Sequence, residues 1–106
     1  MKNWKGLIQP EVSKRTSLNH LEELFKALSS HWRIFILKTI AENPCAQCDM
    51  EQLLSIDKST ISRHIRILRL NKLVKVKSQG TMKLLSIQDQ SILDLIDLAE
   101  KIVSRQ

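Results

Sequence analysis

Long apolar runs are absent from this 106-residue sequence, and their absence excludes a membrane-spanning segment. The longest such stretch is Ile34–Leu37, whereas a spanning helix needs about 20 apolar residues. The beginning of the chain also lacks the apolar segment of a signal peptide. We therefore expect a cytoplasmic protein with no membrane partner.

Cysteines are few, and the motifs of common catalytic sites are missing. Two cysteines cannot form the framework of a disulfide-rich protein. The sequence contains no Gly-rich phosphate loop, no metalloprotease helix and no serine elbow. We therefore predict that the protein is not an enzyme.

The sequence does contain enough apolar residues for one core, together with an excess of positive charge. Apolar residues make up 42% of the chain, as in globular proteins. A chain of this length forms a single domain, and pairing with a second copy would enlarge its modest core. The 17 Lys and Arg residues outnumber the 11 Asp and Glu residues, for a net charge of +6. This charge favours an anionic partner such as nucleic acid, although a basic pI also occurs as a background property.

The helical spacing of apolar residues predicts five helices. They are expected at residues 18–28, 31–42, 48–54, 58–70 and 89–103. Ser17, Ser30 and Asp57 are suitable N-caps, and Asn71 is expected to end the fourth helix in the left-handed conformation. The second helix is apolar nearly all round, so we expect it to be the buried central helix.

After the fourth helix the apolar period changes from helical to alternating. Residues 73–77 and 82–87 alternate around a turn that contains Gly80, which predicts a β-hairpin. Compact helices followed by a basic hairpin are typical of the winged helix-turn-helix. We expect a mostly α, dimeric fold of order α-α-α-α-β-β-α. It would comprise an N-terminal arm (residues 1–16) and a DNA-binding and dimerisation domain (residues 17–106).

The fourth predicted helix is the candidate DNA-recognition helix. Ile61, Ile65 and Leu68 form its buried stripe, so its polar residues lie opposite. Short side chains at its start let the backbone approach a phosphate, and Arg63 can reach a guanine edge. The predicted DNA-contacting residues of this helix are Lys58, Ser59, Thr60, Ser62, Arg63, His64 and Arg66. Those of the hairpin are Lys75, Lys77 and Lys83.

Two of these assignments have simpler alternatives. His64 is equally suited to a hydrogen bond within the protein at the edge of the core. The hairpin lysines also suit the protection of an edge strand against aggregation. Both alternatives stay open at the level of sequence.

These segments resemble the arsenic-repressor (ArsR/SmtB) family of winged-helix transcription factors. Leu24–Ser29 is similar to the family's opening "hhKALsdptR", and Arg33–Leu37 is similar to "RlrIL". Ser59–Ile65 is close to "STVSRHL", the most specific segment. Lys72 replaces the usual Gly of "LRxaGLV". The resemblance extends over residues 18 to about 87, most of the chain.

The resemblance implies a homodimeric repressor. The first and last helices would form the dimer interface, and the two recognition helices would contact a palindromic DNA operator. Half-sites would lie roughly 34 Å apart, one turn of DNA. An inducer that binds the DNA-free form better than the DNA-bound form would lower the affinity for the operator.

Cys45 and Cys48 fall where many family members have metal-binding cysteines, but their spacing is C-x-x-C rather than C-x-C. At the start of a helix we expect a lowered thiol pKa, because the helix dipole favours the thiolate. Two thiolates can bind a soft metal or metalloid such as arsenite, cadmium or zinc, or can oxidise to a disulfide. Arsenite prefers three thiolates, so its third ligand would be solvent, a cysteine of a partner chain or an external thiol. Zinc needs two further ligands, such as His31, Asp49 or Glu51.

These cysteines therefore predict release from DNA by a thiol-directed inducer. Thiol redox or reactive-sulfur sensing is one alternative, and a regulator with inert cysteines is another. A thiol–disulfide enzyme would need a strand and a βαβ setting around the motif, in place of the long helix predicted before it. A purely structural winged helix would lack salt-dependent DNA binding.

The last predicted helix is acidic but contains no histidine. Some family members bind zinc or nickel there through Asp and His ligands, so we expect this second type of metal site to be absent. Its acids are expected to be solvated or to pair with Lys101 and Arg105. They are Asp89, Asp94, Asp97 and Glu100.

Overall fold

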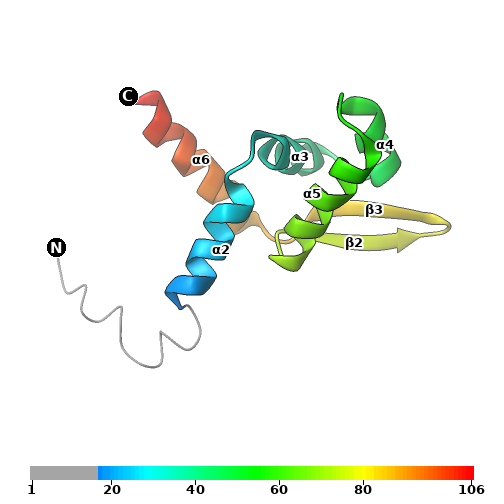
Figure 1. The fold of residues 1–106 in the computed structure, drawn as a ribbon, viewed down its shortest axis with the longest axis horizontal. Helices are drawn as coiled ribbons and strands as arrows, with labels where there is room; N and C mark the ends of the chain where they lie inside the picture. Colours follow the sequence, from blue (N-terminus) through cyan, green and yellow to red (C-terminus); the bar gives the residue numbers. More distant parts are fainter. Residues whose placement is uncertain (1–16) are drawn as a thin grey trace.

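The computed structural model describes residues 17–106, which form five helices and one three-stranded antiparallel sheet (Figure 1). The helices are α2 (Leu18–Leu28), α3 (His31–Glu42), α4 (Gln47–Leu53), α5 (Lys58–Leu70) and α6 (Gln90–Ser104). The strands are β1 (Cys45–Ala46), β2 (Val74–Gln79) and β3 (Met82–Ile87). The arm expected at residues 1–16 lies outside the described residues. None of the helices between Ser17 and Gln106 is long and apolar enough to cross a membrane.

The predicted helix starts are confirmed by their capping hydrogen bonds. The side chain of Ser17 accepts from the backbone N–H of His20 at 3.2 Å, and that of Ser30 accepts from Arg33 at 3.3 Å. The carboxylate of Asp57 accepts from the N–H of Thr60 at 3.3 Å. Each bond satisfies an N–H group that has no partner inside its helix. These caps fix where α2, α3 and α5 begin.

The predicted end of α5 is wrong in one detail: Lys72, not Asn71, adopts the left-handed conformation. Lys72 has φ +57°, whereas Asn71 has φ −93°. The N–H groups of Lys72 and Leu73 donate to the carbonyls of Arg69 and Leu68, at 3.0 and 2.9 Å. This is the Schellman pattern, in which the residue after the C-cap must have positive φ. The Asn71 side chain instead donates to the Ile67 carbonyl at 2.9 Å.

The sheet contains the predicted hairpin and one strand that the sequence did not predict. β2 and β3 pair antiparallel around a two-residue turn at Gly80 and Thr81, and Gly80 has φ +65°. Glycine suits the first position of such a turn because positive φ is strained for other residues. β1 adds to the other edge of β3, with Cys45 opposite Leu85.

The core lies where the helices meet the sheet, and α3 runs through it as predicted. Ile36 and Leu37 of α3 are completely buried, although Phe35 on the same helix is 44% exposed. Figure 1 places α2 and α6 at one end of the molecule and the tip of the hairpin at the other. The core residues are Ala27, Ile36, Leu37, Ile40, Met50, Leu54, Ile61, Ile65, Leu68, Leu73, Val74, Leu85, Ile92 and Ile96.

Candidate nucleic-acid interface

Helix α5 presents one apolar and one basic side. Ile61, Ile65 and Leu68 are at most 3% exposed and fix the inner side of the helix. The helical period places Arg63 and Arg66 roughly opposite, and both are exposed. The arginines therefore point outward on a helix whose depth is set by the core.

The segment that contains α5 and the hairpin carries many basic residues and no acid. No Asp or Glu occurs between Lys58 and Gln88, yet eight of the 17 Lys and Arg residues do. All eight are exposed: Lys58, Arg63, Arg66, Arg69, Lys72, Lys75, Lys77 and Lys83. Arg69 and Lys72 were not among the predicted contacts, although the absence of acids over this stretch would have indicated them. An acid-free surface of this kind favours binding to a phosphate backbone.

The first turn of α5 is held by a cluster around Asp57. The hydroxyls of Ser59 and Thr60 both donate to the Asp57 carboxylate, the second at 2.6 Å. The hydrogen bond from Ser59 is the largest cause that lowers the pKa of Asp57 to about 2, and the bond from Thr60 is the next largest. Both hydroxyl protons are thus directed at the cap. In this arrangement the two side chains stabilise the helix start, and their contact with phosphate stays a prediction.

Both flanks of α5 are hydrogen-bonded to other helices. On one flank, Nε2 of Gln47 in α4 lies 2.9 Å from the hydroxyl oxygen of Ser62. On the other flank, Nη1 of Arg33 in α3 lies 3.0 Å from Nδ1 of His64. Of the two interpretations of His64, this geometry favours the hydrogen bond within the protein. Burial lowers the pKa of His64, and the charges of Arg33, Arg63 and His31 lower it further.

The hairpin lysines do not all share a face. Lys75 and Lys77 lie on the face of β2 opposite the buried Val74. Lys83 is the cross-strand partner of Ser78 and so lies on the other face, near the tip. β2 is also an edge strand, because the strand order is β1-β3-β2. The lysines therefore flank the hairpin on both sides, which fits DNA contact and edge protection alike.

The cysteines lie beside this surface, but not in the environment that the sequence predicted. Cys45 is in β1 and partly buried, whereas Cys48 is exposed in the first turn of α4. Burial raises the pKa of the Cys45 thiol, and the charges of Asp49 and Cys48 raise it further. The expected lowering is thus wrong for Cys45, because burial of its side chain in β1 disfavours the charged thiolate.

A zinc site built from one chain's cysteines and acids is not assembled. Among residues 17–106, no three His, Cys, Asp or Glu side chains are grouped so as to hold a metal ion. The suggested ligand Asp49 instead accepts from the backbone N–H of Ala46 at 3.1 Å. The thiols of Cys45 and Cys48 are therefore the soft ligands that this region offers.

The four acids of α6 are exposed, which agrees with the expected solvated face, but the expected ion pairs within α6 are replaced by other partners. Glu100 forms an ion pair with Lys38 of α3, not with Lys101 or Arg105. Asp89 is the N-cap of α6 and accepts from the N–H of Ser91 at 2.8 Å.

An apolar groove of about 690 Å³ lies between α2 and α6. Phe25 and Val103, on its two walls, are 56% and 65% exposed. Leu18 and Leu21 extend the apolar surface along α2, and Ile102 extends it along α6. A contiguous exposed apolar surface of this type marks a site of protein association.

The helices, the sheet order and the basic face together define a winged helix-turn-helix DNA-binding protein. The model of the family described as "Bacterial regulatory protein, arsR family" matches residues 32–76. The chain belongs to the arsR family of regulatory proteins, as the sequence resemblance predicted.

Three relatives are described as transcriptional regulators. A transcriptional repressor SmtB homolog of Synechocystis is 28% identical over 88 residues, which cover 83% of this chain and 67% of the relative. An uncharacterized helix-turn-helix-type regulator of Methanocaldococcus jannaschii is 33% identical over 81 residues, covering 76% and 91%. A cadmium resistance regulatory protein CadC homolog of Staphylococcus aureus is 27% identical over 90 residues, covering 84% and 74%. None of these descriptions names a catalytic activity.

A solved structure has the same fold as residues 17–106. It is a homodimeric winged helix-turn-helix DNA-binding domain from Mycobacterium bovis, with a TM-score of 0.80 and 20% identity. The match covers 100% of this chain and 93% of that one. The winged helix-turn-helix fold predicted from the sequence is thereby confirmed.

Proposed function

We propose that the protein is a homodimeric transcriptional repressor that is released from a palindromic operator by a thiol-directed inducer at Cys45 and Cys48. The observation that supports DNA binding most strongly is the surface from Lys58 to Lys83, which has exposed Lys and Arg residues and no acid. In this proposal α5 enters the major groove and the hairpin contacts the backbone or the minor groove. The proposal includes a cytoplasmic location, where a protein that binds an operator acts.

The α2–α6 groove supports a homodimer. Its exposed apolar side chains would be covered by the same helices of a second copy, since a two-fold axis brings identical surfaces together. The M. bovis domain with the same fold is described as homodimeric. Two recognition helices in one dimer require two half-sites of opposite orientation, hence a palindromic operator.

The position of the cysteines supports an inducer site that is coupled to DNA binding. Cys45 lies in β1, which pairs with β3 of the hairpin. Gln47 lies between the two cysteines and is bonded to Ser62 of the recognition helix. A ligand that bridges both sulfur atoms would displace the intervening residues, and with them this bond. The inducer would then favour an arrangement unsuited to the operator.

The donor set favours a soft metal or metalloid, such as arsenite, cadmium or zinc. Thiolates are the preferred ligands of such ions. The chain supplies two, and solvent, an external thiol or a partner chain would complete the coordination. The relative of S. aureus described as a cadmium resistance regulator makes cadmium a suitable first probe. Oxidation of the two thiols to a disulfide is the competing mechanism, because the cysteines are three residues apart and both are free.

Replacing both cysteines is expected to abolish induction without loss of DNA binding. We expect the Cys45→Ser/Cys48→Ser variant to bind operator DNA within about twofold of wild type, because neither thiol lies on the basic face. Cadmium, arsenite or zinc should release the reduced wild type and leave this variant bound. The measurement is a gel shift on DNA selected from random sequences. Equal release of both proteins by every metal would contradict the proposal, and release by peroxide alone would favour the disulfide mechanism.

Cadmium binding is expected to strengthen with pH. The thiols must lose their protons to bind, and burial raises the pKa of Cys45. The Cys45 thiol is therefore still protonated near neutrality, and each displaced proton makes the apparent affinity rise about tenfold per pH unit. Chelator competition between pH 6 and pH 8, followed by the absorbance of cadmium–thiolate bonds, measures this slope. The Cys45→Ser variant should show a shallower slope, and an unchanged slope would exclude Cys45 as a ligand.

A further inference from the structure

Arg33 joins three helices through one guanidinium group. Its Nε donates to the Ala27 carbonyl at 2.7 Å, and its Nη2 donates to the Lys26 carbonyl at 3.1 Å. Its Nη1 reaches Nδ1 of His64 at 3.0 Å. Ala27 and Lys26 belong to the last turn of α2, where carbonyls lack partners inside the helix. Arg33 thus connects the end of α2 and the start of α3 to the recognition helix α5.

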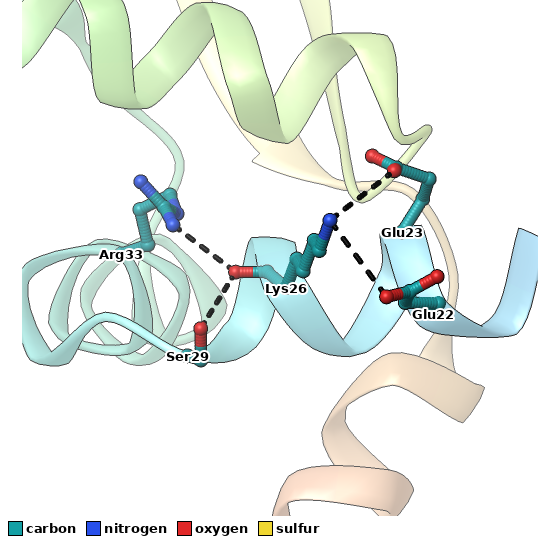
Figure 2. A network of polar contacts seen from close by, with 5 residues as sticks. All are labelled: Glu22, Glu23, Lys26, Ser29 and Arg33. Carbon is teal, nitrogen blue, oxygen red and sulfur yellow. Dashed lines mark hydrogen bonds and ion pairs between the residues drawn. The ribbon is translucent and has the colours of Figure 1, made fainter. Parts of the chain in front are cut away.

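The nearby glutamates pair with Lys26 and not with Arg33. Figure 2 shows that Lys26 pairs with Glu22 and Glu23, whereas Arg33 reaches the carbonyl oxygen of Lys26. Within residues 17–106, no carboxylate lies within ion-pair distance of Arg33. A guanidinium has only donors, so Nδ1 of His64 must be the acceptor and the ring must be neutral. Arg33 therefore holds His64 in a single tautomer, protonated at Nε2.

Packing contacts alone do not fix the side of the recognition helix that faces α2. A surface hollow of about 430 Å³ lies between α2 and the C-terminal half of α5, with Arg33 and Ile67 in its wall. The buried stripe of α5 sets its depth, but polar bonds on its flanks also oppose rotation about its axis. Residues 62 and 64 are two positions apart and so lie on opposite flanks of the helix. Arg63, between them, points away from the core.

We propose that Arg33 is a positioning residue for DNA recognition, which fixes the rotation of α5 through His64 and thereby aims Arg63 at the bases. The role rests on the proposed binding of DNA by α5. Gln47 provides the matching restraint on the opposite flank through Ser62. Because Arg33 is anchored on α2, it also links the surface proposed for dimerisation to the surface proposed for DNA.

A double-mutant cycle tests this role. Arg33→Met and His64→Leu should each lower the ratio of operator to random-DNA affinity about tenfold, since α5 remains basic but is misaligned. The double variant should have an affinity ratio no more than about twofold below that of the single variant with the lower ratio, because both substitutions remove the same contact. His64→Gln should keep the ratio within about threefold of wild type, since its carbonyl oxygen can accept from Arg33. Losses that multiply to about a hundredfold, or single variants that bind like wild type, would overturn the proposal.

Two further measurements keep the outcomes distinct. Thermal unfolding of each variant shows whether it is folded. If Arg33→Met fails to fold, the His64→Leu variant tests the proposal instead, because it leaves the bonds from Arg33 to α2 intact. The ¹⁵N chemical shifts of His64 report its tautomer without DNA. We expect an unprotonated Nδ1 in wild type and mixed tautomers in Arg33→Met. A protonated Nδ1 in wild type would overturn the Arg33 contact itself, whereas the expected tautomer in a protein that binds no DNA would contradict only the proposed function.

Discussion

Replacing Arg63 with alanine is expected to lower operator affinity by about 1–3 kcal/mol, roughly 5- to 150-fold. Arg63 is exposed on the outer side of α5, opposite Ile61 and Ile65, where a guanidinium can form two bonds to a guanine edge. The loss should be larger on the operator than on random DNA, so the sequence preference should relax. Fluorescence anisotropy with both DNAs at one fixed salt concentration gives the two affinities.

Lys83→Ala is the matched control for Arg63→Ala, because each substitution removes one exposed positive charge. Lys83 lies near the tip of the hairpin, where contact with the backbone carries no sequence information. We expect it to weaken operator and random DNA by the same factor and to lower the salt slope by about one. If Arg63→Ala also weakened both DNAs equally, Arg63 would be a phosphate contact and its predicted contact with a base would be wrong.

Introducing a charge into the α2–α6 groove is expected to cost still more operator affinity. Val103 is 65% exposed in the single chain, so Val103→Glu should leave the fold of the protomer intact. In the dimer it would bury a carboxylate without a partner, which is strongly unfavourable. Separated protomers lose the second half-site contact, and operator affinity should fall by about 100-fold or more. Analytical ultracentrifugation and anisotropy on the same samples measure association and binding.

Lys101→Ala controls for the change in charge, because it also lowers the net charge by one. Lys101 lies on α6 and is not among the residues that line the groove. We expect this variant to remain dimeric and to bind the operator within about twofold of wild type. A Val103→Glu protein that sediments as a dimer would show that the groove is not the dimer interface.

The sequence predicted those parts of the fold that depend on local patterns. The apolar spacing and the caps of α2, α3 and α5 are properties of neighbouring residues, and so is the alternation of the hairpin around Gly80. The end of α5 was assigned to the wrong residue because Asn favours positive φ more than Lys does. Lys72 has positive φ because it follows the C-cap in the Schellman hydrogen-bond pattern, and this position outweighs the intrinsic preference of the residue type.

Features that depend on distant residues were not predictable from one sequence. β1 is only two residues long, and its pairing with β3 spans about 40 positions of the chain. The contact between Arg33 and His64 joins residues 31 positions apart, and the ion pair between Lys38 and Glu100 joins residues 62 apart. The outward arginines of the candidate site followed from the period of α5. The burial of Cys45, which reverses the expected pKa shift, required the tertiary structure.

The central claim is that the acid-free face of α5 and the hairpin binds DNA. An NMR titration of ¹⁵N-labelled protein with selected operator DNA tests it most directly. We expect the largest amide shifts at Arg63, Arg66 and the hairpin around Gly80, and small shifts along α6. Shifts confined to the α2–α6 end of the molecule, or none at all at saturating DNA, would contradict the account.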